Sequence, residues 1–382
     1  MNKPKIRFKG FEGEWKERKI GDALSINSGR DYKHLEEGDI PVYGTGGYML
    51  SVNERISDCD AIGIGRKGTI DKPQYLRAPF WTVDTLFFLI AKVGIDLDFA
   101  YNLSQVIGWR KYDESTGVPS LSKNNIEKIP ISLPSLLEQR ALASYFTSLD
   151  AQIAASTSRL SSLKQIKAAS LLNMFPQKGE MVPRVRFKGF QGEWDSPSIE
   201  EVFEVRNGYT PSKSVESYWI RGTIPWFRME DIRASGGFLE DSIQHITPKA
   251  VKNNGLFEKD SIIMATTATI GVHAQLIADS LANQQFTNFS IRKSLREGII
   301  AKYVYYAFFG IDEWAIKNTN SGGLLSVNMP LLLKQPFFVP SLPEQRAIAS
   351  YFTTLDAQIT LHRERLEKLK QIKAACLEKM FA

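Results

Sequence analysis

The sequence lacks the residues and runs that several classes of protein need. It has two cysteines, Cys59 and Cys376, and four histidines, too few for a disulfide scaffold or a Cys/His zinc site. No run of about 18 apolar residues occurs, which argues against a membrane-spanning helix. The first residues, MNKPKIRFKGF, have no apolar stretch of the secretory kind. We therefore expect a cytoplasmic protein with reduced thiols.

Motifs of common enzymes are also missing. No GxxxxGK[ST] phosphate loop, HExxH pair, GxSxG elbow or [ND]PP[FY] tetrapeptide occurs. The sequence GIGRKG at residues 63–68 matches GxGxxG, but Pro73 follows closely and argues against the helix that a dinucleotide site needs. We predict a non-catalytic chain without metal or cofactor of its own. A scattered carboxylate cluster of a metal-dependent nuclease stays open as an alternative.

What the sequence does contain is a long internal repeat. PKIRFKGFEGEW from Pro4 returns as PRVRFKGFQGEW from Pro183. PSLLEQRALASYFTSLDAQI from Pro134 returns as PSLPEQRAIASYFTTLDAQI from Pro340, and about 29 of the 42 positions that begin there are identical. The segments between these copies share little sequence. The pattern indicates one large unit used twice, with a common frame around two different bodies.

Charge follows the same division. The formal net charge is +6, yet residues 16–133 and 195–336 each come to about −1. The excess of positive charge therefore lies in the repeated frame. Charge alone does not mark the bodies as binders of a polyanion.

Each copy of the frame predicts a long helix. From Leu137 to Phe175 there is no glycine or proline, and apolar residues recur at spacings of four and three, as they do in the second copy. A narrow apolar seam of this kind favours pairing with another helix. Two helices of about 38 residues, near 55 Å long, are best covered by each other. Since one chain builds the unit twice, we expect an antiparallel coiled coil about a pseudo-two-fold axis.

The bodies contain short strands, two shorter helices and loops rich in groups that contact nucleic acids. Expected helices cover residues 98–109 and 300–309, and strand runs begin at Trp81 and Asp260. Glycine lets backbone approach closely, while Arg, Lys, Thr, Tyr and Gln contact phosphates or base edges. The candidate DNA-binding residues are Tyr43, Thr45, Arg66, Lys67, Thr69 and Trp81 in the first body, and Arg206, Tyr209, Thr210, Trp226, Arg228, Thr267, Gln284 and Gln285 in the second.

The EQR helix starts and the RFKGFxGEW leads resemble the specificity (S) subunit of type I restriction–modification systems (the HsdS family). GRKGT at Gly65 and the run from GYTPS to IPWFRMEDI are similar to target-recognition sequences of that family. The resemblance implies that each body reads one half of a bipartite sequence in double-stranded DNA. It also implies that the coiled coil sets the spacer between the halves and docks two modification (methyltransferase) subunits, with restriction subunits as further partners. S-adenosylmethionine, ATP and Mg would then belong to the partners.

These considerations predict an α+β protein with two mixed target-recognition domains separated by the coiled coil. The expected parts are the lead 1–15, the first recognition domain 16–133, the first helix 134–182, the second lead and domain 183–336, and the second helix 337–382. Spacer phosphates are expected to meet Arg7, Lys9, Arg186 and Lys188, and partner subunits to meet Glu138, Gln139, Arg140, Glu344, Gln345 and Arg346. The competing interpretation is a protein-interaction scaffold that does not bind DNA.

Overall fold

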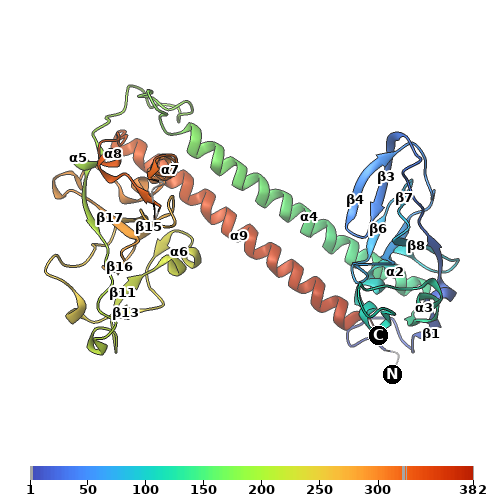
Figure 1. Cartoon of the computed structure of the whole chain (residues 1–382). Coiled ribbons are helices and arrows are strands. Elements are labelled where there is room, and N and C mark those ends of the chain that lie inside the picture. Colours follow the sequence, from blue (N-terminus) through green and yellow to red (C-terminus); the bar gives the residue numbers. More distant parts are fainter. Residues whose placement is uncertain (1–2, 321–322, 324, 382) are drawn as a thin grey trace. The chain divides into compact units, whose positions relative to one another are not determined.

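The computed structural model describes residues 3–320, 323 and 325–381. Residues 1–2 of the expected lead, residues 321, 322 and 324 of the expected second domain, and residue 382 of the expected second helix lie outside the described residues. The chain forms two compact units. Unit 1 comprises residues 1–159 and 362–382, and unit 2 comprises residues 160–361. Each unit holds one body and a part of each long helix, α4 (Leu136–Asn173) and α9 (Leu342–Met380) (Figure 1).

The body of unit 1 is built on two sheets. The larger sheet has the strand order β2-β8-β5-β6, the smaller sheet has the order β4-β3-β7, and β1 pairs with β9. The elements are β1 (Lys16–Lys19), α1 (Ile20–Ala23), β2 (Leu24–Ser28), β3 (Glu37–Gly44), β4 (Gly47–Val52), β5 (Ala61–Gly65), β6 (Gln74–Leu76), β7 (Trp81–Thr82), β8 (Leu86–Ala91), α2 (Leu97–Val106), a 3-10 turn (Trp109–Tyr112), α3 (Lys123–Lys128) and β9 (Pro130–Leu133).

Unit 2 repeats this plan. Its larger sheet has the order β10-β17-β14-β15-β12, and its smaller sheet has the order β13-β11-β16. The elements are α5 (Ile199–Val202), β10 (Phe203–Asn207), β11 (Ile224–Phe227), α6 (Met229–Ser235), β12 (Phe238–Leu239), β13 (His245–Ile246), β14 (Ile262–Ala265), β15 (His273–Leu276), β16 (Leu281–Ala282), β17 (Phe286–Ile291), α7 (Ala301–Lys317), β18 (Thr319–Asn320), β19 (Ser326–Val327) and α8 (Met329–Leu333), with 3-10 turns at Glu216–Tyr218, Pro248–Ala250 and Lys293–Leu295.

The shorter helices begin where the sequence supplies a cap. Asp96 accepts the amide of Phe99 and so caps α2. The helix expected at residues 98–109 corresponds to α2, which ends earlier, at Val106, and the helix expected at residues 300–309 corresponds to the longer α7. The GIGRKG segment, residues 63–68, covers the end of strand β5 and the beginning of the loop to strand β6. No helix follows it there, as a dinucleotide site would require.

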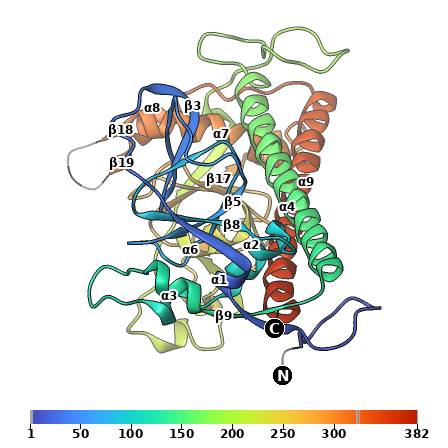
Figure 2. The same ribbon diagram turned by 90° about the vertical axis from the view of Figure 1, so that its right-hand side faces the viewer.

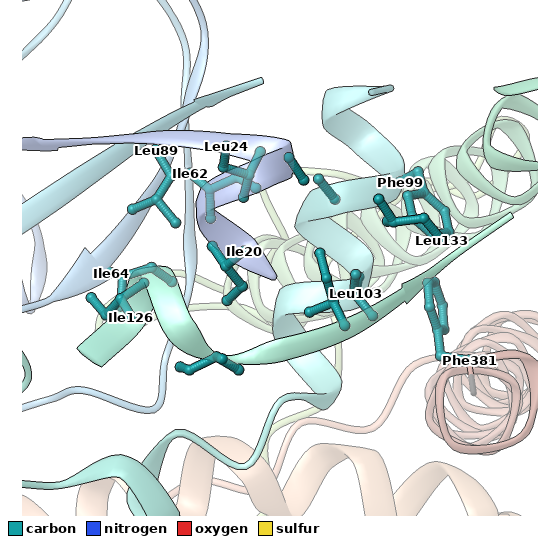
Figure 3. Packing of buried hydrophobic residues seen from close by; sticks show 14 of the residues in the cluster. Ile20, Leu24, Ile62, Ile64, Leu89, Phe99, Leu103, Ile126, Leu133 and Phe381 are labelled. Atoms are coloured by element: carbon teal, nitrogen blue, oxygen red, sulfur yellow. The ribbon is translucent and has the colours of Figure 1, made fainter. Parts of the chain in front are cut away.

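The core of unit 1 joins the body to both long helices. Figure 3 shows Leu24, Ile62, Ile64 and Leu89 of the larger sheet on the side of Ile20 from α1, with Ile126 of α3 next to Ile64. Phe381, directly after α9, lies against Phe99 of α2 and Phe146 of α4, with ring centroids 5.5 and 5.7 Å apart. The end of the second repeat therefore completes the hydrophobic core around the first body.

Unit 2 has the corresponding core. Phe175, just beyond α4, stacks on Phe352 of α9 at 6.2 Å and lies 5.9 Å from Tyr303 of α7. Met174 is buried in the same cluster. Met174 and Phe175 are the repeat equivalents of Met380 and Phe381, so each unit receives the end of the other copy's helix.

Contacts inside each unit establish that α4 and α9 pair in antiparallel fashion, and both views show the two helices side by side (Figures 1 and 2). In unit 1, Lys373 Nζ lies 2.6 Å from Asp150 Oδ1. In unit 2, Lys167 Nζ lies 2.6 Å from Asp356 Oδ1. These are the same two repeat positions in exchanged roles, which confirms the predicted pairing. Lys167 and Lys373 are occupied by these partners and do not offer free charge.

Candidate nucleic-acid interface

The start of each long helix is a clamp for the lead segment. The Glu138 side chain, 2% exposed, accepts hydrogen bonds from Arg7 Nε and Nη2, both at 2.7 Å. Trp15 Nε1 donates to the same carboxylate at 3.3 Å, and Arg7 Nη1 also donates to the Gly13 carbonyl. The hydrogen bonds to Glu138 raise the pKa of Arg7 above its usual value, which favours the charged guanidinium.

The second copy forms the same clamp. Arg186 donates from Nε (2.7 Å) and Nη2 (2.8 Å) to Glu344, whose side chain is 1% exposed, and this bonding raises the pKa of Arg186. Trp194 Nε1, the equivalent of Trp15 Nε1, has no partner there. Four residues were expected to face spacer phosphates. Arg7 and Arg186 are engaged in these ion pairs within the chain, whereas Lys9 and Lys188 are exposed.

The glutamine of the EQR motif ties the helix to the body. Gln139 accepts the amide of Asp96 at 3.0 Å, and Gln345 accepts the amide of Ile300 at 2.9 Å. Asp96 and Ile300 are the N-caps of α2 and α7. The pairs Glu138 and Gln139, and Glu344 and Gln345, are thus buried intramolecular connectors. Of the residues expected to dock partners, Arg140 and Arg346 are exposed.

Loops from four parts of the first body meet around the turn between β7 and β8. The amide of Gly29 donates to the Leu86 carbonyl at 3.2 Å, and that of Arg30 to the Thr82 carbonyl at 2.8 Å. Gln74 Nε2 ties in the β3–β4 turn by donating to the carbonyl of Gly44. We name residues 29–30, 43–46, 66–69 and 82–86 loop cluster 1.

Two further backbone bonds complete loop cluster 1. Val83 donates its amide to the Tyr43 carbonyl at 3.0 Å, and Arg66 donates its amide to the Thr85 carbonyl at 2.7 Å. Behind residues 66–69, Asp113 Oδ1 accepts the amides of Ser120 and Ser115, which lowers the pKa of Asp113. The loops are therefore held rigidly by backbone bonding, leaving their side chains available for recognition.

Five of the six candidates of the first body lie in loop cluster 1. Arg66 and Lys67 are exposed, and Tyr43, Thr45 and Thr69 are half-buried. Trp81 differs, because it is buried and its Nε1 donates to the Arg30 carbonyl at 2.9 Å. The structure gives Trp81 the role of a support under the cluster.

The second body builds the same arrangement from other residues. Tyr209 donates its amide to the Ala282 carbonyl at 2.9 Å, and Asn283 donates its amide to the Phe227 carbonyl at 3.0 Å. Thr266 donates its amide to the Gln285 carbonyl at 2.9 Å. We name residues 208–210, 227–228, 266–269 and 282–286 loop cluster 2.

Within loop cluster 2, Gln284 is exposed and its Oε1 accepts a hydrogen bond from Thr210 Oγ1 at 2.5 Å. Gln285 Oε1 accepts from Asn283 Nδ2 at 3.2 Å, and Tyr209 Oη donates to the Ala250 carbonyl. Arg228 Nη2 pairs with Glu230 at 2.9 Å, and Thr267 forms a bridge with Ser326. The structure brings these six candidates together in one cluster: Tyr209, Thr210, Arg228, Thr267, Gln284 and Gln285.

The two remaining candidates of the second body are structural in this conformation. Arg206 donates to the carbonyls of Asn254 and Leu256, and its guanidinium lies 5.3 Å from the Phe257 ring. Trp226 is buried, and its Nε1 donates to the Tyr209 carbonyl at 3.0 Å. Trp226 therefore supports loop cluster 2 as Trp81 supports loop cluster 1.

Sequence reasoning missed two glycines on which both clusters depend. A Cβ at Gly29 would overlap the carbonyl oxygens of Thr82 and Val83, and one at Gly208 would overlap those of Ala282 and Asn283. The signal was present, because each glycine follows the repeated tryptophan of its lead at the same spacing, Trp15 to Gly29 and Trp194 to Gly208. The exposed Arg30 and Asp84 of loop cluster 1 were missed as well.

In the part of the chain that the structure describes, no group of three or more His, Cys, Asp or Glu side chains is placed to hold a metal ion. Among the described helices, none is both long and apolar enough to cross a bilayer.

Two bodies with matched loop clusters, each joined to the paired helices by an equivalent Arg–Glu clamp, define a two-domain recognition protein. Residues 12–165 and 191–371 match the family described as type I restriction modification DNA specificity domain. Because this match covers most of the chain, the chain belongs to that family, and each half carries one specificity domain.

Curated relatives agree with this assignment. The chain is 42% identical over 152 residues to the type I restriction enzyme EcoprrI specificity subunit of Escherichia coli, a match that covers 40% of the chain and 37% of the relative. The EcoR124I/EcoR124II specificity subunit of E. coli is 25% identical over 47% of the chain and 46% of its own length. The chain thus matches less than half the length of these two relatives.

Solved structures share the fold. The type I restriction–modification S subunit from M. genitalium has a TM-score of 0.65 at 17% identity, covering 100% of this chain and 99% of its own. The HsdS subunit from Thermoanaerobacter tengcongensis has a TM-score of 0.51 at 16% identity, covering 96% of both chains.

Proposed function

We propose that this chain is the DNA specificity subunit of a type I restriction–modification complex and performs no catalysis itself. Each loop cluster reads one half of a divided target in duplex DNA. The observation that carries the proposal is the construction of one loop scaffold twice, with the same backbone bonds and different side chains. A repeated scaffold with divergent exposed residues fits two recognition tasks of the same kind on two different sequences.

The domains follow from this proposal. Residues 16–133 form the first reader, and residues 183–336 form the second lead and reader. Residues 134–182 and 337–382 form the helices that fix the spacer between the half-sites. Continuous helices suit this task because readers on one face of B-DNA must keep to whole turns of about 34 Å. S-adenosylmethionine, ATP and Mg are bound by partner subunits, which we propose to be two modification subunits, with restriction subunits where the DNA is cut.

The candidate contacts divide by their chemistry. Arg66, Lys67, Lys9 and Lys188 are exposed cations suited to phosphates. Thr45, Thr210 and Gln284 are polar side chains of the loop clusters suited to base edges. Arg140 and Arg346, at the exposed side of the two helix starts, are suited to acidic groups of a modification subunit.

A body exchange tests the proposal. Residues 16–133 are replaced by the corresponding body of another family member, and the methylated motif is read by sequencing genomic DNA from cells with the modification subunits. We expect one half-site to change while the other half-site and the spacer length are kept. An unchanged motif would contradict the proposal.

The purified chain and its complex also distinguish the proposed DNA reader from a protein-interaction scaffold and from a nuclease. Binding to duplex DNA whose log affinity falls linearly with log salt is expected of the DNA reader and not of a protein-interaction scaffold. Cutting of DNA by the purified chain with a divalent metal alone would instead show that the chain is a nuclease.

A further inference from the structure

We propose that Asp84 and Gln284 occupy the same position in the two loop clusters and are base-selecting residues, with Asp84 accepting a hydrogen bond from the N4 amino group of cytosine. The inference rests on the proposed function and assigns one chemical preference to each reader. The residues around Asp84 (WTVDTLF, 81–87) and those around Gln284 (LANQQFT, 281–287) are identical at no position, so the structure, and not the sequence, identifies the two residues as counterparts.

Backbone hydrogen bonds establish the equivalence. The residue before each has an equivalent bond. Val83 donates its amide to the Tyr43 carbonyl near the end of β3, and Asn283 donates its amide to the Phe227 carbonyl at the end of β11. The residue after each also has an equivalent bond: the carbonyl of Thr85 accepts the amide of Arg66, directly after β5, and the carbonyl of Gln285 accepts the amide of Thr266, directly after β14. Both neighbours of Asp84 and of Gln284 are therefore anchored in the same way.

The two residues stand on tight turns. The amide of Leu86 donates to the Val83 carbonyl at 2.9 Å, and that of Phe286 donates to the Asn283 carbonyl at 3.1 Å. Asp84 and Gln284 are the first central residues of these turns, and both side chains are exposed. A short turn anchored on both sides fixes the backbone position from which one exposed side chain projects, which favours selective recognition.

A purely local role for Asp84 does not fit its surroundings. Aspartate in turns commonly accepts a backbone amide, as Asp113 does from Ser115 at 3.0 Å and Asp31 does from Lys33 at 3.3 Å. Within the described part of the chain, the exposed Asp84 carboxylate has no hydrogen-bond or ion-pair partner. Its acceptor oxygens are thus available to a ligand.

Charge selects that ligand. Asp84 is the one acidic residue of loop cluster 1, which also holds Arg30, Arg66 and Lys67. A carboxylate is repelled by phosphates, so in a DNA groove it is favoured where it meets a hydrogen-bond donor on a base. Cytosine presents such a donor, N4, in the major groove, and aspartate is the acceptor that suits it. Gln284 instead carries a donor, Nε2, and an acceptor, Oε1, whose second lone pair is available beside the hydrogen bond from Thr210, so its amide matches adenine N7 and N6.

The test uses the full chain assembled with its modification subunits and a library of duplexes with randomised bases. Bound duplexes are sequenced for the wild type, Asp84→Asn, Gln284→Ala and the control Asp31→Asn, whose side chain serves a local turn. Thermal unfolding of each variant shows that the fold is kept.

We expect Asp84→Asn to weaken the preference for a G·C pair at one position of one half-site by roughly tenfold to hundredfold. Gln284→Ala is expected to weaken an A·T preference in the other half-site alone, and Asp31→Asn to leave the motif unchanged. The inference is overturned if a folded Asp84→Asn variant keeps the wild-type motif, loses affinity equally for all duplexes, or changes an A·T position. A wild-type complex that selects no sequence would contradict the proposed function itself.

Discussion

The repeated frame and the two bodies keep their common structure by different means. In the frame, the same side chains make the same contacts, so Arg7–Glu138 and Arg186–Glu344 are two copies of one ion pair. In the bodies, the side chains differ and the common contacts are made by backbone amides and carbonyls, as around Asp84 and Gln284. Backbone bonding is indifferent to residue type, so a reader can change its exposed residues and keep its scaffold.

Because the frame depends on side-chain contacts, we expect the largest loss of stability when one side chain of a clamp is removed. Arg186→Met leaves the carboxylate of Glu344 buried without its counter-ion, and we expect unit 2 to lose about 3 kcal/mol of stability in chemical denaturation. Arg7→Met should cost less, because Trp15 Nε1 still donates to Glu138, whereas Trp194 makes no such bond. Equal losses would contradict this account of the two clamps.

The control for this comparison is the ion pair between the exposed Arg184 and the half-buried Glu180, at 3.0 Å. Arg184→Met should change stability by less than about 0.5 kcal/mol, because solvent screens an exposed ion pair. The double variant Arg186→Met with Glu344→Met should recover much of the loss, since it removes the buried charge together with its partner.

The bodies' dependence on backbone contacts predicts the next effect. Gly208→Ala introduces a Cβ that overlaps the carbonyl oxygens beneath the loop, so we expect about 2–3 kcal/mol of destabilisation and a weaker preference in one half-site. Gly46→Ala, in the β3–β4 turn, is the control because its Cβ meets no atom within 4 Å. Denaturation and duplex selection measure both properties, and a neutral Gly208→Ala would show that the scaffold is not fixed there.

The frame could be predicted from the sequence because it repeats and because long helices have a clear period. The apolar spacing of four and three includes Phe146 and Phe352, which are buried, and the antiparallel pairing followed from the duplication. The clamp roles of Glu138 and Glu344 could not be predicted, because a charged residue in a first helical turn is ordinarily exposed. The loop clusters were found only in part, since their common feature is a set of backbone bonds that leaves almost no trace in residue type.

A smaller effect concerns the exchange of helix ends between the copies. Residues 1–182 lack the segment 362–382 that completes unit 1, but their own Met174 and Phe175 match Met380 and Phe381. We expect this half to form a symmetric dimer in which Lys167 of one copy pairs with Asp150 of the other. Lys167→Glu should weaken dimerisation roughly tenfold, and adding Asp150→Lys should restore it. Sedimentation measures the dimer, and the exposed Lys164→Glu serves as control; a monomeric half at high concentration would contradict the exchange.

The smallest expected effect is a change in the salt dependence of DNA affinity, which distinguishes unpaired lysines of the frame from a paired arginine. Lys9 and Lys188 are exposed at equivalent positions of the leads, whereas Arg184 is neutralised by Glu180. If the two lysines meet phosphates, Lys9→Ala and Lys188→Ala should each reduce the slope of log affinity against log salt by about 0.9 and leave the recognised motif unchanged. Arg184→Ala should alter neither property. Titrations of the assembled complex with its duplex at several salt concentrations measure the slope. An unchanged slope in both lysine variants would confine the phosphate contacts to the bodies, and the frame's excess positive charge would then have to serve its partner subunits.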